Sequence, residues 1–177
     1  MFTTWTPIIH YCNLGISSGI LLVVHNQDNQ PRSAGEGDSM NNAISVMPGA
    51  VSIQAVYERL LKGTKADFIC LSTGYEAVIG DWYDETFAPK LFATQINTRE
   101  VVADNAGNRT YGKQKDGVKN QVRFMVDSAE SDLILGDDFV AIISFNPANP
   151  YAVIIEDPII VASVRVWFNA IWASATR

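Results

Sequence analysis

Histidine and cysteine are scarce in this chain, which has two of each among its 177 residues. His10 and His25 have no carboxylate or cysteine partner at metal-ligand spacing, and Cys12 and Cys70 lie far apart, in no CxxC or CxxH pattern. We therefore expect no metal site, no cofactor and no disulfide framework. Cys70 lies in an apolar run and is interpreted as a structural thiol, and the reducing cytoplasm is the expected compartment.

Positive charge is also in short supply. Thirteen lysines and arginines stand against nineteen acidic residues, which gives a net charge of −6. Nucleic-acid-binding surfaces normally carry a basic patch that displaces counterions from phosphate, so we expect no direct nucleic-acid binding by this chain. Lys113, Lys115 and Lys119 form a small basic cluster, but Asp116 lies among them, and we interpret the cluster as a solvated face.

Long uninterrupted hydrophobic runs are missing as well. Residues 8–24 are mostly apolar but are interrupted by His10, Asn13 and serines. The run falls short of the roughly 20 apolar residues that a membrane helix needs. The first basic residue is Arg32, so the basic start of a signal peptide is not seen. We expect neither a membrane-spanning segment nor a signal peptide.

The composition divides the chain into three parts. Residues 1–25 form an apolar segment to which the sequence assigns no definite structure. Residues 26–42 are rich in Asn, Gln, Gly, Ser and Asp, and are predicted to be a linker because they cannot bury enough apolar surface to order themselves. Residues 43–177 alternate between strand and helix signals, which predicts one α/β domain.

Within this domain, short apolar runs predict strands and amphipathic stretches predict helices. The first helix has an apolar stripe from Ile53 to Leu61 at helical spacing and ends at Gly63, and a second helix is capped by Asp81 and kinked at Pro89. Residues 104–108 are predicted to be a turn. The predicted strands cover residues 44–47, 67–71, 99–103, 121–126, 132–135, 139–145 and 152–155.

The last predicted helix begins with Asp157 as its N-cap and Pro158 at the first helical position. Aromatic residues on such a helix usually belong to a core or to a dimer interface, and we assign Trp167, Phe168 and Trp172 to one or the other. The full apolar stripe consists of Ile160, Val164, Trp167, Phe168, Ile171 and Trp172.

Residues 130–144 contain two apolar strands joined by the turn Gly136-Asp137-Asp138. This segment resembles the catalytic hairpin of the phospholipase D superfamily, whose motif is His-x-Lys-x-x-x-x-Asp with the histidine as the nucleophile. Aligning Asp137 with the aspartate of the motif puts Glu130 in place of the histidine and Asp132 in place of the lysine. Carboxylates there would repel a phosphodiester, so we expect a fold kept without its chemistry and not an enzyme.

The acidic residues of this hairpin have a second interpretation. Glu130, Asp132, Asp137 and Asp138 offer the oxygen ligands that Ca²⁺ and Mg²⁺ prefer. Their spacing matches no EF-hand or similar loop, and turns beside strands are often acidic for reasons of solubility. We therefore predict no metal here.

The order of elements over about residues 43–173 resembles the phospholipase-D-like effector domain of TrmB-like transcriptional regulators. That resemblance implies a phospholipase-D-like αβα sandwich with a mixed sheet and a C-terminal amphipathic helix. The family's winged helix-turn-helix finds no match in residues 1–24, so DNA contact would require a winged helix absent here. The segments that carry the resemblance are residues 53–61, 87–90, 99–102, 138–145, 152–158 and 168–172.

Polar and aromatic residues follow the predicted strand 67–71, and open α/β sheets bind their ligands beyond the carboxyl ends of strands. Aromatic rings beside carboxylates suit a polar small molecule such as a sugar. The alternative is that Trp82 and Tyr83 pack a helix against the sheet, and that Ser72 and Thr73 are caps. The candidate ligand-binding residues are Ser72, Thr73, Tyr75, Glu76, Trp82 and Asp104.

The leading functional hypothesis is a non-catalytic domain that senses a small-molecule effector, or mediates homodimerisation, for a TrmB-like transcriptional regulator. Ligand binding would shift the population of states by changing how the last helix packs at a dimer interface. One alternative is a phosphodiesterase of the phospholipase D superfamily with a diverged active site. Another is a structural interaction module of a larger assembly.

Overall fold

The computed structural model describes residues 43–177. His10, His25 and Cys12 lie outside the described residues, as do the predicted apolar segment 1–25 and the predicted linker 26–42. Within the described part of the chain, no helix has both the length and the apolar character needed to cross a lipid bilayer.

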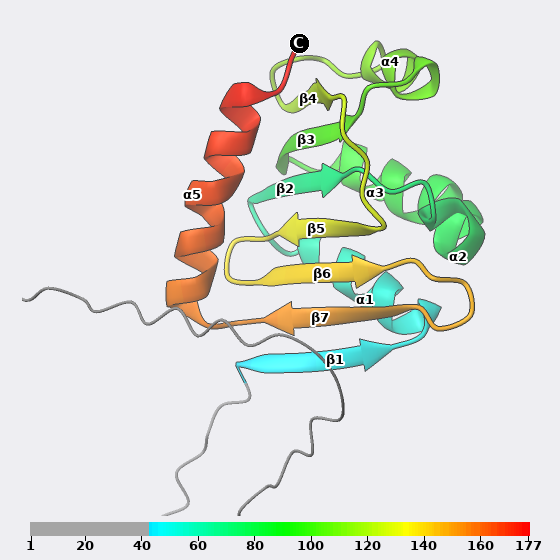
Figure 1. The fold of residues 1–177 in the computed structure, drawn as a ribbon, viewed down its shortest axis with the longest axis vertical. Coiled ribbons are helices and arrows are strands. Elements are labelled where there is room, and N and C mark those ends of the chain that lie inside the picture. Colours follow the sequence, from blue (N-terminus) through cyan, green and yellow to red (C-terminus); the bar gives the residue numbers. More distant parts are fainter. Residues whose placement is uncertain (1–42) are drawn as a thin grey trace, which may run out of the picture. The chain divides into compact units, whose positions relative to one another are not determined.

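A seven-stranded mixed sheet, in the order β1-β7-β6-β5-β2-β3-β4, forms the centre of the described residues (Figure 1). β2, β3 and β4 are parallel to one another. The other four neighbouring pairs, β2–β5, β5–β6, β6–β7 and β7–β1, are antiparallel. All the predicted strands are therefore confirmed, with small shifts at their ends. The bounds are β1 Ile44–Pro48, β2 Lys65–Cys70, β3 Asn97–Ala103, β4 Asn120–Met125, β5 Ser131–Leu135, β6 Val140–Ser144 and β7 Tyr151–Ile155.

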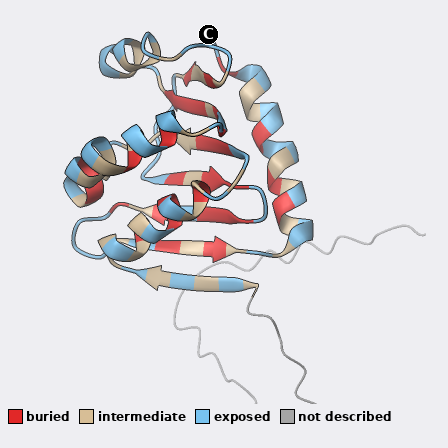
Figure 2. Ribbon diagram, turned by 180° about the vertical axis from the view of Figure 1, so that it is seen from behind, coloured by how far each residue is buried: buried red, intermediate tan, exposed pale blue. Residues whose placement is uncertain are grey.

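Helices cover both faces of this sheet, so the predicted α/β class with a C-terminal helix is confirmed. α1 to α4 lie on one face and α5 crosses the strands on the other, and the buried positions follow the middle of the strands (Figure 2). The helical segments are α1 Ala50–Leu60, α2 Tyr75–Trp82, the π-helix η1 Tyr83–Phe87, α3 Ala88–Ala93, α4 Ala106–Gly112 and α5 Pro158–Ser174.

α1 is the predicted amphipathic helix, and its apolar stripe faces the sheet. Ile53, Val56 and Leu60 are buried against the sheet. Their spacing of three and four residues puts them on one side of the helix, and each contributes about 1.5–3 kcal/mol of burial free energy relative to exposure.

The second helix begins earlier than predicted. α2 starts at Tyr75, directly after Gly74, and Asp81 is an exposed residue near its end, so the predicted cap is wrong. The predicted irregularity at Pro89 takes the form of the π-helix η1 immediately before α3. Proline has no amide hydrogen to donate and its ring crowds the preceding turn, which accounts for a wider turn at this point.

The turn predicted over residues 104–108 is also wrong, because α4 begins there. The Asn105 side chain accepts a hydrogen bond from the backbone N–H of Asn108 at 2.8 Å and so caps α4. Gly107 and Gly112 weaken the helical signal of this segment in the sequence.

α5 begins at the predicted cap, where Asp157 Oδ1 accepts hydrogen bonds from the N–H groups of Ile159 and Ile160. Phe168 is buried and Trp172 is half-buried and stacked on it, but Trp167 is 62% exposed. Trp167 is therefore not a core residue, because the buried side of α5 runs through Val161, Val164 and Phe168 at helical spacing, and Trp167 lies about 100° away from Phe168 around the axis.

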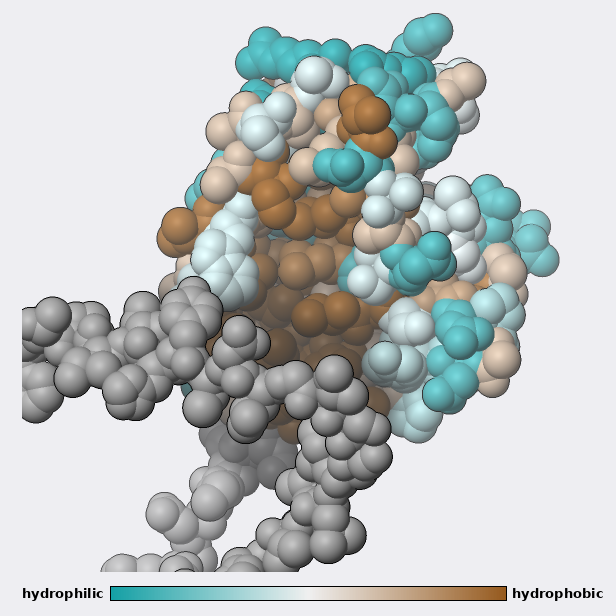
Figure 3. All heavy atoms as spheres, viewed as in Figure 1, coloured by the Kyte–Doolittle hydropathy of each residue, from teal (hydrophilic) through white to brown (hydrophobic). Residues whose placement is uncertain are grey.

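α5 covers only part of its sheet face among the described residues. A row of apolar side chains crosses that face through paired residues of neighbouring strands, from Val101, which is fully buried, to Ile142 at 40% and Val46 at 65% exposure. Hydrophobic residues gather in the hollow beside α5 in the space-filling view (Figure 3). The row consists of Val101, Ile69, Leu133, Ile142, Val153 and Val46.

Candidate functional site

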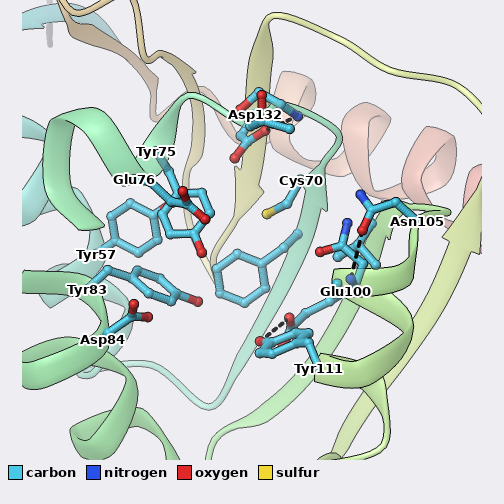
Figure 4. Close-up of a pocket in the computed structure, with 16 residues that line it drawn as sticks. Tyr57, Cys70, Tyr75, Glu76, Tyr83, Asp84, Glu100, Asn105, Tyr111 and Asp132 are labelled. Carbon is cyan, nitrogen blue, oxygen red and sulfur yellow. Dashed lines mark hydrogen bonds between the residues drawn. The ribbon is translucent and has the colours of Figure 1, made fainter. Parts of the chain in front are cut away.

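A pocket of about 530 Å³ lies where the parallel strands β2 and β3 end and the antiparallel strand β5 begins. α1, α2 and η1 supply one wall, and α4 supplies the opposite wall (Figure 4). The position is the carboxyl end of parallel strands, where helices and loops can converge on a ligand.

Asp132 of β5 projects into this pocket and is only 2% exposed. Its Oδ1 accepts a hydrogen bond from the backbone N–H of Ser72 at 3.1 Å. Burial raises the pKa of the Asp132 carboxyl to about 6, although the hydrogen bond from Ser72 opposes the shift. Among residues 43–177 no salt bridge joins Asp132 to a cation. This is an unusual state for a buried carboxylate, which normally carries a compensating charge.

Two further polar side chains face the same end of the pocket. The Ser72 Oγ is buried and has no hydrogen-bond partner among the described residues. Burial raises the pKa of the Cys70 thiol well above its usual value, and the nearby Asp132 charge raises it further. The raised pKa favours the neutral Cys70 thiol over the thiolate at physiological pH.

Glu100 of β3 is the second buried carboxylate of the pocket, and it is fully paired. Lys115 Nζ lies 2.8 Å from its Oε1, and the Tyr111 hydroxyl donates to its Oε2 at 2.7 Å. Lys115 is nearly buried, with its ammonium against the rings of Tyr111 and Phe92. The prediction of a solvated face is therefore wrong for Lys115, because Glu100 and two aromatic rings offset the cost of burying its charge.

The wall opposite Glu100 is aromatic. The Tyr83 ring centroid lies 5.6 Å from that of Tyr57 and 5.5 Å from that of Tyr75, and both pairs meet edge to face. Tyr57 is 2% exposed, burial raises the pKa of its hydroxyl, and no hydrogen bond joins that hydroxyl to another described residue. Glu76 and Asp84 stand at the exposed rim beside these rings.

Four of the six predicted ligand-binding residues line this pocket: Ser72, Thr73, Tyr75 and Glu76. Trp82 does not, because its ring packs against Tyr57 and Phe87 at centroid distances of 6.3 Å and 5.8 Å. Here the alternative interpretation, helix packing, describes the structure.

Asp104 is also outside the lining, because both its carboxylate oxygens accept from Arg109 at 2.7 Å. Its neighbour Asn105 lines the pocket instead. The sequence analysis missed other lining residues, among them Tyr57, Glu100, Asn108 and Tyr111.

The three positions aligned with the phospholipase D motif do not meet. Glu130 is exposed in the loop before β5, and Asp137 lies in the turn at the far end of β5. Asp137 accepts a hydrogen bond from the backbone N–H of Thr64 at 2.7 Å, away from Asp132. Within residues 43–177 no group of three or more His, Cys, Asp or Glu side chains is placed to hold a metal ion.

Comparison with known proteins gives matches by structure only. No family model matches the sequence, and no curated protein sequence matches it. The fold is similar to that of TrmBL2, described as an archaeal chromatin protein with a novel mode of DNA binding (TM-score 0.53, 19% identity, 75% of this chain and 53% of that chain covered). It is also similar to NucT from Helicobacter pylori (TM-score 0.54, 9% identity, 75% and 97% covered). Nuc from Salmonella typhimurium, a phospholipase D family member, gives a TM-score of 0.46 at 13% identity, with 75% and 96% covered.

These identities establish a shared fold and no more. The predicted α/β fold with a mixed sheet and a C-terminal helix is confirmed, and the chain shares this fold with TrmBL2 and NucT. The matched region spans about half the length of TrmBL2.

Proposed function

We propose that residues 43–177 form a non-catalytic ligand-binding domain that serves a TrmB-like transcriptional regulator. The observation that carries this proposal is the pocket, in which Asp132 is buried without a cation and the Ser72 Oγ without a hydrogen-bond partner among the described residues. A bound ligand would supply those partners. The fold shared with TrmBL2 supports the connection with gene regulation, and DNA contact would come through another domain or partner, since this chain is acidic.

The absence of catalysis is part of the proposal. Residues 43–177 contain no histidine, and the histidine and lysine positions of the hairpin motif hold Glu130 and Asp132. Cys70, the thiol in the pocket, has a raised pKa. We expect no hydrolysis of a chromogenic phosphodiester, and hydrolysis that is lost in Glu130→Ala/Asp137→Ala would establish the phosphodiesterase alternative instead.

Signalling would use β2 and β3, because successive side chains of each strand lie on opposite faces of the sheet. β2 carries Cys70 in the pocket and Asp67 under α5, and β3 carries Glu100 in the pocket and Arg99 under α5. A ligand that moves the ends of β2 and β3 would therefore bias the packing of α5, which is a population shift between two arrangements.

A homodimer would read out such a shift. The side of α5 that faces away from the sheet carries Ile159, Val166 and Trp167, all exposed, at spacings of seven and eight residues that put them on one side. With the exposed row that ends at Val46, they form the apolar surface on which we place the dimer interface.

A thermal-shift screen of small polar compounds tests the binding proposal, because only a ligand of the folded state raises the melting temperature by mass action. Hits should stabilise the wild-type chain and lose their effect in Ser72→Met, which fills the buried end of the pocket. Ser128→Met, in an exposed loop outside the pocket, is the matched control and should keep the effect. Stabilisation of wild type and Ser72→Met by the same compounds to the same extent, or of neither, would remove the pocket from the function.

A further inference from the structure

The pocket has an excess of negative charge that the protein leaves unbalanced. Four carboxylates line it, and its lining contains no lysine, arginine or histidine. Glu100 is neutralised from behind by Lys115, but Asp132, Glu76 and Asp84 make no salt bridge with any described residue. Three carboxylates therefore face the cavity without a cation.

The groups around these carboxylates suit a positive charge with hydrogen atoms to donate. The Tyr57 hydroxyl is carried by a residue only 2% exposed, points to no described partner and can accept a hydrogen bond. The rings of Tyr57, Tyr75 and Tyr83 bring aromatic edges and faces to the same wall (Figure 4). Aromatic rings beside carboxylates attract ammonium groups, most strongly where water is excluded.

Other ligand classes satisfy the pocket less well. A phosphate or carboxylate ligand would be repelled, because no lining residue carries a positive charge. A neutral polyol could donate a hydroxyl to Asp132 but would leave its charge unbalanced in a buried position. An ammonium group both donates the hydrogen bonds and balances the charge.

We propose that the pocket binds a small aliphatic amine, with one ammonium group at Asp132 and a second at the rim between Glu76 and Asp84. The buried carboxylate and the rim pair form two separate acidic positions, which favours a diamine over a monoamine. The inference rests on the proposed ligand-binding function and specifies the chemical class of its ligand.

Isothermal titration calorimetry with putrescine tests the proposal. Its neutral control is 1,4-butanediol, which has the same carbon chain with hydroxyl groups in place of the ammonium groups. At about pH 7.5 and roughly 20 mM salt, where screening is weak, putrescine should bind one to one and at least about tenfold more tightly than the diol. Asp132→Asn should weaken putrescine binding by about tenfold or more, because it removes the buried charge while it keeps an acceptor for the Ser72 N–H.

Two rim variants make the measurement specific. Glu76→Gln should weaken putrescine binding by about threefold to tenfold, since a rim charge is partly screened. Glu85→Gln removes the same charge from an exposed residue of η1 that does not line the pocket, and it should leave the affinity within about twofold. Equal affinity for putrescine and the diol, or equal effects of Glu76→Gln and Glu85→Gln, would overturn the proposal.

The failure of this inference is distinguishable from failure of the proposed function. If maltose, and not putrescine, stabilises the wild-type chain and loses its effect in Ser72→Met, the pocket is a ligand site and the amine is the wrong class. If neither putrescine nor any compound of the thermal-shift screen acts through the pocket, both proposals are overturned.

Discussion

Two buried aspartates on neighbouring strands show how differently the two faces of the sheet are built. Asp67 of β2 and Asp132 of β5 are each 2% exposed. Asp67, under α5, receives two hydrogen bonds of 2.7 Å from Arg99, and Arg165 Nη1 lies 3.5 Å away. Asp132, on the pocket face, has one backbone N–H and no cation among the described residues.

The difference separates a carboxylate that holds the fold together from one that is available to a ligand. A buried charge is tolerated when its partners replace the water it has lost, as Arg99 and Arg165 do for Asp67. Arg99 also stacks on Phe168, with its guanidinium carbon 4.7 Å from the ring centroid, so that the ion pair and the apolar packing of α5 support each other. Asp132 has no cation to offset its burial, and that burial raises the pKa of its carboxyl.

The largest effect should come from breaking the paired site. Asp67→Ala removes the shared partner of Arg99 and Arg165 and leaves two partly buried guanidinium groups without their carboxylate, so we expect a loss of about 3–5 kcal/mol in the free energy of unfolding. Urea denaturation followed by circular dichroism measures it. Asp138→Ala, which breaks an exposed pair with Arg59, is the control and should cost at most about 1 kcal/mol. Equal losses in the two variants would show that the Asp67 network is not a stabilising contact.

The same kind of substitution at the unpaired site should have the opposite sign. Asp132→Asn removes a charge whose burial is not compensated, and a pKa raised from 3.8 to about 6 sets an upper limit of about 3 kcal/mol on the gain in stability at neutral pH. Urea denaturation at about pH 7 measures the gain. Asp127→Asn, in an exposed loop, changes the net charge equally and should shift stability by less than about 0.5 kcal/mol. A destabilised Asp132→Asn would mean that the carboxylate is better compensated than its surroundings indicate.

Acid should remove this difference between wild type and Asp132→Asn. A group whose pKa is raised on folding contributes stability that is fully present below its unfolded pKa and is lost as the pH rises through the folded pKa. The advantage of Asp132→Asn should therefore be largest above about pH 6 and should vanish below about pH 4. Burial, together with the Asp132 charge, raises the pKa values of Cys70 on β2, Tyr57 on α1 and Tyr75 on α2, so these three groups stay neutral across this range. If the stability gain of Asp132→Asn over wild type does not change with pH, its cause is not the ionisation of Asp132.

Local signals in the sequence predicted the framework of both faces. Apolar alternation predicts the strands, Asp157 and Pro158 predict the start of α5, and the polar residues after strand 67–71 predict which end of the sheet carries the pocket. Each of these depends on a few adjacent residues, and the periodicity of strands and the chemistry of caps are local properties.

The pairings that distinguish the two faces could not be predicted in this way. Whether Asp67 meets Arg99, and whether Glu100 meets Lys115, depends on strand order and on where α4 lies. Because side chains alternate along β3, Glu100 and its neighbour Val101 must face opposite sides of the sheet. The sequence does not show which cations lie on the Glu100 side. The environments of Trp82 and Trp167 could not be predicted for the same reason. Both belong to apolar helix stripes, and tertiary packing decides which residues of a stripe face the core.

The smallest effect on stability, and the one that extends the comparison to the α5 face, is expected at Trp167. Its side chain is 62% exposed, so Trp167→Ala should change the free energy of unfolding of the monomer by less than about 0.5 kcal/mol. If the exposed side of α5 is the dimer interface, the same variant should elute as a monomer in size-exclusion chromatography with light scattering, because interface tryptophans are frequent hot spots. Val126→Ala, at another exposed apolar position in the β4–β5 loop, should leave the mass unchanged. A Trp167→Ala chain with an unchanged dimer mass would remove Trp167 from the interface and leave the apolar row that ends at Val46, on the same face of the sheet, as the surface to be tested. A monomeric wild-type chain would overturn the homodimer itself.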